Sequence, residues 1–557
     1  MTDRSAPVPT TRTGESSAPP ADPLSRRPDP EPLPEFDVLQ AVVNRFWRPW
    51  IPLLALLLLT LLALNLSTYW VPTRDGALYL SLARSLAAGH GYQVDGIPHT
   101  LVFPGFPLML AAVVGLFGEN FFFLNLLITL FGVASLVLVW LLLRPWLGSR
   151  LAVVVTLITG TSETFLLYSS RVLTDVPHLF FVLLALWLIQ QMWFQPTPTR
   201  RVVAAVLAGA VVMLASMIRP NGLVLVPVAL AALFYRKRNP MSLREKLTAL
   251  FAWIVAIGAP FFYWYRFIEN VDVSLRSTYF SSSSLIRGFA AFARYVYRQT
   301  LTLPGQVAET LSRNELTLVG NIIVLILVVI GFVRLARRGA WHLSFYSVLA
   351  TGFLAMQLFN RRYLLAILPL LVIAFLLGTT WLLYRLQRLR PRSRALRKSL
   401  PFALVFLILF FPLANAYPVF KLTRERYLSP FYQKFEEGRW RDRLTLADWM
   451  QSQTPPDTVY WTRYNYIYSY LSHRIVRGPF SAYRGPSPLA WSSTNGLLRD
   501  FARWKPDYLI VDSQSDERRR IDKFIQRSRL HAVRVEVPEV HSLRIYRLLE
   551  PPALPPS

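Results

Sequence analysis

Residues 71–86 read VPTRDGALYLSLARSL and follow the first long apolar segment of the chain, which runs from Trp50 to Trp70. A helix needs about 20 apolar residues to cross a bilayer, and this segment is long enough. Asp75 therefore lies on the first loop after a membrane crossing and opens an amphipathic segment that ends near Gly89. An acidic residue at such a place is a candidate for chemistry at a membrane surface.

The composition indicates a polytopic α-helical membrane protein. Of the 557 residues, 53% are hydrophobic and 14% are aromatic, and the mean hydropathy is +0.35, which is high for a soluble chain of this length. The net charge of +28 falls mostly in short Lys and Arg clusters between apolar segments, where the positive-inside rule places them. This pattern argues against nucleic acid as a partner. The absence of cysteine excludes disulfides, thiolate metal sites and a cysteine nucleophile.

The basic clusters predict about eleven transmembrane helices with the N-terminus in the cytoplasm. The expected location is the inner (plasma) membrane. Residues 1–38 are rich in Pro, Ser, Thr and charge, and predict a disordered cytoplasmic tail. Residues 39–419 form the predicted transmembrane domain, with outer loops at 71–120 and 268–315. Residues 420–557 have a mixed polar composition and predict a small extracytoplasmic α/β domain.

The segment from Phe103 to Phe117 is apolar but short for a crossing, and it contains Pro104 and Pro107. We expect a juxtamembrane or re-entrant helix here. If this segment crossed the membrane, every later basic cluster would lie on the outer side, against the positive-inside rule.

Two acidic residues are expected at the outer face. Asp75 opens one helix, and Asp175 in the stretch RVLTDVPH (residues 171–178) opens another. Each can simply be the N-cap of its helix, since Asp is a favoured cap. The two residues come from distant parts of the chain, however, and acidic residues are few on this side, so a polar cavity shared by both is the functional alternative.

Several arginines are expected on the same outer side, against the positive-inside rule. Arg219 ends one span, Arg361 and Arg362 begin another, and Arg171 precedes the second aspartate. They can snorkel or pair with the aspartates, or they can bind a phosphate in bidentate fashion. The candidate phosphate-binding residues are Arg74, Arg171, Arg219, Arg361, Arg362 and Tyr363.

His99 and His178 are expected near these residues and are weak candidates for metal ligands. No ligand spacing specifies a metal site, so no cofactor is assigned, although a divalent cation stays an option.

The order of these motifs resembles the GT-C glycosyltransferases, of the bacterial aminoarabinose transferase and protein O-mannosyltransferase type. The resemblance rests on short motifs and on their order along the chain: Asp75 followed by ALYLSLARSL, GHGY at 89–92, Pro104 to Pro107, Arg171 to Pro177, Met217 to Gly222, Arg362 to Pro369, and the C-terminal stretches 447–449, 470–474 and 506–511. One departure concerns Gly76, because many members of the family have a second acidic residue there.

The resemblance implies a polyprenyl-phosphate-linked sugar donor and transfer with inversion to a lipid, glycan or protein acceptor at the outer face of the membrane. It implies Asp75 as the general base. Asp175 is then the second acid, and the family's late arginine corresponds to Arg362. The alternatives are a lipid-linked-sugar flippase or transporter without transferase activity, and an inactive relative with a binding role, which Gly76 would favour.

Overall fold

A computed structural model gives the architecture of the chain. It describes residues 33–100, 102–235, 240–271, 301–311, 317–356, 361–389, 394–427, 439–478, 501–502, 504–512, 521–526 and 531–549. Most of the predicted tail and most of the predicted outer loop 268–315 lie outside these ranges.

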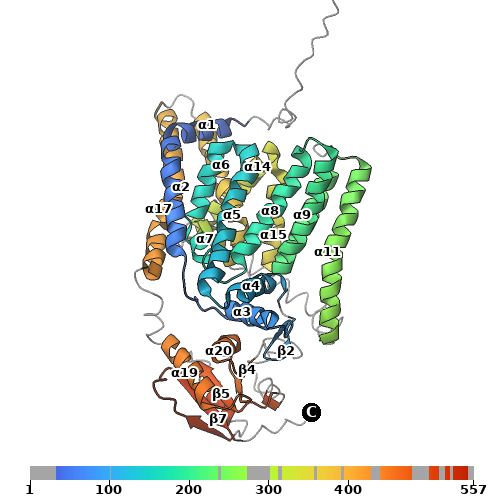
Figure 1. Ribbon diagram of the computed structural model, residues 1–557. Helices are drawn as coiled ribbons and strands as arrows, with labels where there is room; N and C mark the ends of the chain where they lie inside the picture. The colour runs from blue at the N-terminus through green and yellow to red at the C-terminus, as the bar shows by residue number, and fades with distance from the viewer. Residues whose placement is uncertain are drawn as a thin grey trace, which may run out of the picture.

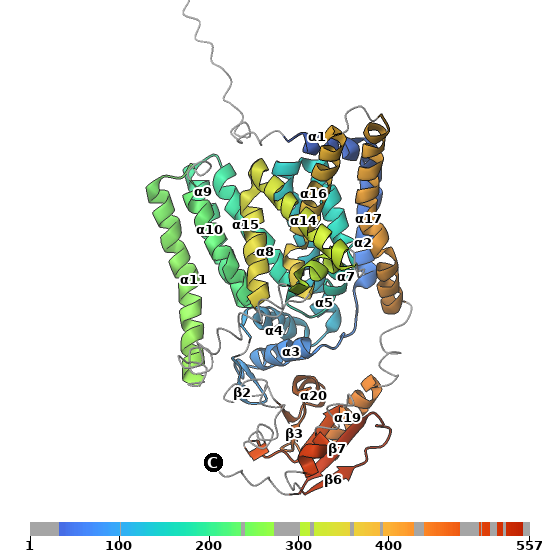
Figure 2. The ribbon, with the colours of Figure 1, turned by 180° about the vertical axis from the view of Figure 1, so that it is seen from behind.

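Apolar helices pack side by side into one bundle (Figures 1 and 2). They are α2 (Ile51–Asn65), α5 (Phe121–Leu147), α6 (Ser149–Gly160), α7 (Glu163–Tyr168), α8 (Asp175–Phe194), α9 (Pro198–Ile218), α10 (Leu225–Phe234), α11 (Leu243–Val271), α14 (Leu318–Leu335), α15 (Trp341–Met356), α16 (Leu368–Leu389) and α17 (Arg394–Tyr427). Within the described ranges, eight stretches are long and apolar enough to cross a membrane, and three apolar helices are shorter. The predicted polytopic helical fold is confirmed, while the number eleven stays a prediction.

The stretch Leu318–Ala355 contains two helices, α14 and α15. Gly339 has φ 102° in the turn η5 (Ala336–Ala340), and this left-handed conformation ends α14. The hydroxyl of Ser344 in α15 donates to the carbonyl of Phe332 in α14 at 2.8 Å, so the two helices lie against each other. The chain therefore reverses direction here, as the basic residues around this turn predict.

Helices α14 and α16 pack backbone to backbone. A Cβ atom at Gly331 would overlap the carbonyl of Ala374, and a Cβ atom at Gly378 would overlap the carbonyl of Leu327. Glycines let membrane helices approach this closely. The contact holds α16, whose first turn follows the 3-10 helix η6 (Arg361–Ile367), against its neighbour.

Two helices lie across one end of the bundle (Figures 1 and 2). They are α3 (Arg74–Ala87) and α4 (Gly105–Phe117), joined by the small hairpin of β1 (Gln93–Val94) and β2 (Ile97–Pro98). The segment Phe103 to Phe117, for which we expected a juxtamembrane or re-entrant helix, forms α4 and lies across the end of the bundle (Figure 1). We refer to this end as the α3 end of the bundle.

A short helix, α1 (Pro34–Val42), lies at the opposite end (Figure 1). Residues 34–38 are thus helical, which corrects the last part of the predicted disordered tail 1–38. The reason is an amphipathic pattern: Phe36 and Leu39 are buried, and Glu35 pairs with Arg334 of α14.

The C-terminal domain lies beyond α3 (Figure 1). Its sheet has the order β4-β3-β5-β7-β6, with the first three strands parallel and the last two antiparallel to their neighbours. The elements are α19 (Arg439–Gln453), β3 (Val459–Trp461), α20 (Asn465–Ser472), β4 (Ile475–Arg477), β5 (Tyr508–Asp512), β6 (Ala532–Val535) and β7 (Leu543–Leu548). The predicted small α/β domain is confirmed.

Candidate active site

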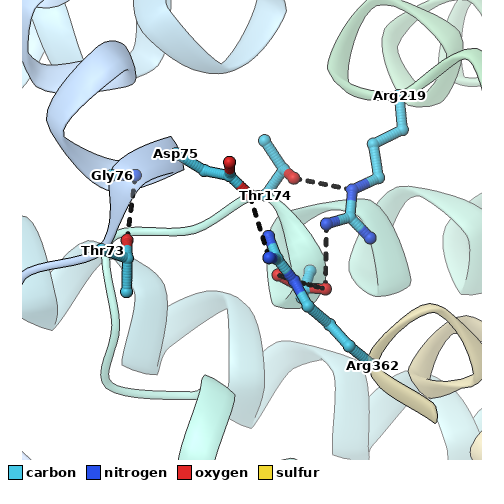
Figure 3. A network of polar contacts seen from close by, with 7 residues as sticks. Thr73, Asp75, Gly76, Thr174, Arg219 and Arg362 are labelled. Atoms are coloured by element: carbon cyan, nitrogen blue, oxygen red, sulfur yellow. Dashed lines mark hydrogen bonds and ion pairs between the residues drawn. The ribbon is translucent and has the colours of Figure 1, made fainter. Parts of the chain in front are cut away.

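The N-terminus of α3 is capped by Thr73 and not by Asp75. Thr73 has extended backbone angles, and its hydroxyl accepts from the amide of Gly76 at 2.9 Å (Figure 3). Asp75 lies in the first turn, and its side chain is 45% exposed. The carboxylate is therefore not used by the cap and points toward the arginines of the bundle.

Gly76 is crowded. A Cβ atom at this position would lie 2.6 Å from the hydroxyl of Thr73 and 3.1 Å from the carbonyl of Val172. A second acidic side chain next to Asp75, which the resembling family often has, does not fit the cap seen here.

Asp175 begins α8 and is fully buried, with no side-chain exposure. Thr174 precedes it as the N-cap residue, without a side-chain cap hydrogen bond, so the cap interpretation of Asp175 is also wrong. Instead, Arg219 donates through Nη2 to Asp175 at 2.9 Å, and Arg362 donates through Nε to both carboxylate oxygens at 3.0 and 2.9 Å. A buried carboxylate needs such partners, because an unpaired buried charge is costly.

Arg362 joins the two aspartates. Its Nη1 donates to Oδ2 of Asp75 at 2.9 Å while its Nε binds Asp175 (Figure 3). The structure thus brings together Asp75, Asp175, Arg219 and Arg362 from α3, α8, the end of α9 and η6. Two carboxylates and two guanidinium groups balance in charge.

Two further residues belong to this network and were missed in the sequence. Thr174 accepts from Nε of Arg219 at 2.6 Å (Figure 3) and hydrogen-bonds to the buried Tyr79 of α3. Burial, followed by the charge of Asp75, raises the pKa of Tyr79 to about 12, so its phenol stays protonated at neutral pH. In the sequence Tyr79 looks like one more residue on the apolar face of an amphipathic helix.

The other predicted phosphate-binding residues lie around the network. Tyr363 packs under the guanidinium of Arg219, at 5.1 Å from its ring centroid. Arg74 lies over the ring of Tyr466 in the C-terminal domain at 5.9 Å. Arg171 has a buried Nε without a hydrogen-bond partner in the described part of the chain, and burial lowers its pKa. The side chain of Arg361 lies outside the described residues.

The two histidines do not join this network. His99 is buried between the rings of Tyr92 and Tyr466, and burial lowers its pKa to about 3. His178 is buried in α8, with Nδ1 at 3.3 Å from the carbonyl of Ala215. Among the described residues no group of three or more metal-binding side chains is present. A divalent cation stays an untested prediction.

Comparison with known proteins agrees with this architecture. The model of the dolichyl-phosphate-mannose-protein mannosyltransferase family matches residues 99–264, a part of the chain that includes Asp175 and Arg219. No curated protein matches the chain by sequence.

Solved structures match over most of the chain. ArnT from Cupriavidus metallidurans, bound to undecaprenyl phosphate, superposes with a TM-score of 0.55 at 13% identity, over 89% of this chain and 98% of that one. The chain has the GT-C fold. A second GT-C structure, the Archaeoglobus fulgidus oligosaccharyltransferase tethered to an acceptor peptide, gives a TM-score of 0.51 at 14% identity, over 85% of this chain and 70% of that one.

Proposed function

We propose that the chain is a glycosyltransferase that moves a sugar from a polyprenyl-phosphate-linked donor to an acceptor, with inversion and with Asp75 as the general base. One observation carries the proposal: Arg362 pairs at once with a half-exposed carboxylate, Asp75, and with a buried one, Asp175. Two matching structures support the two substrate classes: ArnT is bound to undecaprenyl phosphate, and the oligosaccharyltransferase is tethered to an acceptor peptide.

Asp75 suits the role of base by its exposure. A hydroxyl or amine of the acceptor would give its proton to the carboxylate of Asp75 as its oxygen or nitrogen attacks the anomeric carbon. The bond from that carbon to the phosphate oxygen breaks, and the lipid phosphate leaves with the electron pair. One displacement inverts the anomeric centre.

The arginines would stabilise the departing phosphate, where negative charge develops. Arg362 can keep Asp175 on Nε and turn Nη1 from Asp75 to the phosphate, so that donor binding frees the base. Arg171 would be stabilised by a bound anion, since its buried Nε has no hydrogen-bond partner in the described structure. The buried Asp175 would fix the two arginines and not touch the acceptor, because its side chain is fully covered.

The α3 end of the bundle would face the extracytoplasmic side of the inner membrane. At the opposite end, Arg334 and Arg338 contact Glu35 and Phe36 of α1. The positive-inside rule assigns that end to the cytoplasm.

The test uses the full-length protein in vesicles with a radiolabelled polyprenyl-phosphate sugar and a set of lipid, glycan and peptide acceptors. We expect release of lipid phosphate together with labelled acceptor, and loss of both in Asp75→Asn with donor binding retained. Arg441→Gln, which removes an exposed ion pair with Glu539, is the matched control. Transfer by Asp75→Asn at the normal rate would refute the base assignment. Donor crossing the vesicle without release of phosphate would indicate the flippase alternative.

A further inference from the structure

The C-terminal domain touches the site helix α3 through one face of α20. Tyr466 and Tyr470 are four residues apart and therefore lie on the same side of α20. Tyr466 lies under Arg74 at the N-terminus of α3, and Tyr470 packs edge-on against Trp70, just before α3, with ring centroids 4.8 Å apart. The guanidinium of Arg84, in the last turn of α3, lies 4.4 Å from the centroid of the Tyr470 ring.

Arg84 is the centre of a polar cluster at this contact. It pairs with Glu119, from the turn between α4 and α5, through Nε and through Nη2, the latter at 2.8 Å. The hydroxyl of Tyr470 donates to the same carboxylate at 2.8 Å, and Nη1 of Arg84 lies 3.1 Å from Nδ1 of His473. The cluster joins three segments of the chain: α3, the turn between α4 and α5, and α20.

A second contact fixes the β1–β2 hairpin to the same part of the domain. Asp95 in the turn of that hairpin accepts from the hydroxyl of Ser469 at 2.7 Å and from the amide of Val476 at 3.3 Å. Its backbone carbonyl accepts from Arg477 at 3.1 Å. Because β4 is an edge strand of the sheet, Asp95 binds an amide at the edge of the sheet.

We propose that the C-terminal domain, docked through α20, holds α3 in the position that aims Asp75 at the substrate, and that Arg84 and Tyr470 are positioning residues for the reaction. Asp75 and Arg84 lie on one rigid helix, separated by about 14 Å at 1.5 Å per residue. A shift of the Arg84 end of such a helix therefore also moves the Asp75 end. A misplacement of about 1 Å in a reacting group costs about a hundredfold in rate.

The inference rests on the proposed transferase function, so its experiment has one readout that needs activity and one that does not. The full-length protein and its Arg84→Gln variant are compared by transfer kinetics and by hydrogen exchange of the α3 amides. We expect kcat to fall about tenfold or more while KM for the donor changes less than about threefold. We also expect faster exchange in residues 77–87, with exchange in α8 unchanged.

Two further variants separate positioning from general damage. The exchanged pair Arg84→Glu with Glu119→Arg restores the ion pair and should recover part of kcat and of the α3 protection. Arg441→Gln, at an exposed ion pair within the C-terminal domain, should leave both unchanged.

The outcomes separate the two proposals. Wild-type kcat in Arg84→Gln, or unchanged α3 exchange, would overturn the positioning role. If the wild-type protein transfers no sugar, the proposed function fails, and hydrogen exchange still decides whether α20 holds α3.

Discussion

Nη1 of Arg362 donates to Oδ2 of Asp75 at 2.9 Å, so the more exposed of the two acids in the site is paired with an arginine. The same guanidinium holds the buried Asp175 through Nε. In the proposed reaction, an incoming phosphate would compete with the Asp75 carboxylate for Nη1 of Arg362, while Nε stays on Asp175. This arrangement suits a base that is released by the donor.

Arg362→Lys should lower transfer strongly, because an ammonium cannot hold two carboxylates from two fixed arms. Loss of one donor to a developing negative charge costs about 10²–10³ in kcat. We expect that range in steady-state assays, with a smaller change in the donor KM. A rate within threefold of wild type would show that a point charge is sufficient and that the fork geometry has no role.

The two aspartates should differ in their effect on stability. Asp175→Asn leaves Arg219 and Arg362 facing each other in a buried place, and removal of one partner from such a pair costs about 3–5 kcal/mol. Asp75→Asn removes a half-exposed charge and should cost less than about 1 kcal/mol. Thermal unfolding in detergent measures both. Equal melting temperatures for the two variants would contradict the burial difference.

Gly76→Ala should destabilise the start of α3. The added Cβ displaces the Thr73 hydroxyl from its cap, and loss of a cap costs about 1 kcal/mol. Gly115→Ala is the control in α4, where a Cβ meets nothing within 4 Å. There alanine should stabilise the helix by about 0.5–1 kcal/mol. Melting temperatures that move in the same direction for both variants would show that Gly76 is not crowded in solution.

His99 should make the protein sensitive to mild acid. Burial lowers its pKa to about 3, below the unfolded value near 6.5. Between about pH 3 and pH 6.5 the imidazole therefore binds a proton in the unfolded chain and not in the folded chain. The contribution of His99 to the free energy of unfolding is then fully present above about pH 6.5. Below that pH the free energy of unfolding falls by about 1.4 kcal/mol per pH unit. In His99→Phe, which keeps a ring between Tyr92 and Tyr466, the drop in melting temperature from pH 7.5 to pH 5 should be smaller. An equal drop would place the acid sensitivity elsewhere.

The members of the site could be predicted because membrane topology makes charged residues conspicuous. Asp75, Asp175, Arg219 and Arg362 all lie at ends of apolar segments, on the side where basic residues are otherwise rare. Their pairing could not be predicted, since the sequence does not tell which arginine reaches which acid.

The sequence left open whether each aspartate caps its helix or faces a shared cavity. The stretch from Thr73 to Gly76 contains two residues that cap helices well, and the sequence does not choose between them. In the structure Thr73 is the cap, and its hydroxyl accepts from the amide of Gly76.

The contact of α20 with α3 also could not be predicted from the sequence. Tyr466 and Tyr470 look like core residues of a small domain, and both are indeed buried. Only the packing of α20 on α3 shows that part of this core is shared with the helix that carries Asp75.

The glycine contact between α14 and α16 makes the position of Arg362 depend on residues far from the charged groups of the site. Gly378 lies sixteen residues after Arg362, across η6 and the first half of α16, which is roughly 25 Å at about 1.5–2 Å per residue. A side chain at Gly331 or Gly378 would push α16 away from α14 and move the Arg362 guanidinium, which lies just before α16. A saturation mutagenesis map of transfer activity should therefore contain two intolerant positions, Gly331 and Gly378, within the apolar bundle.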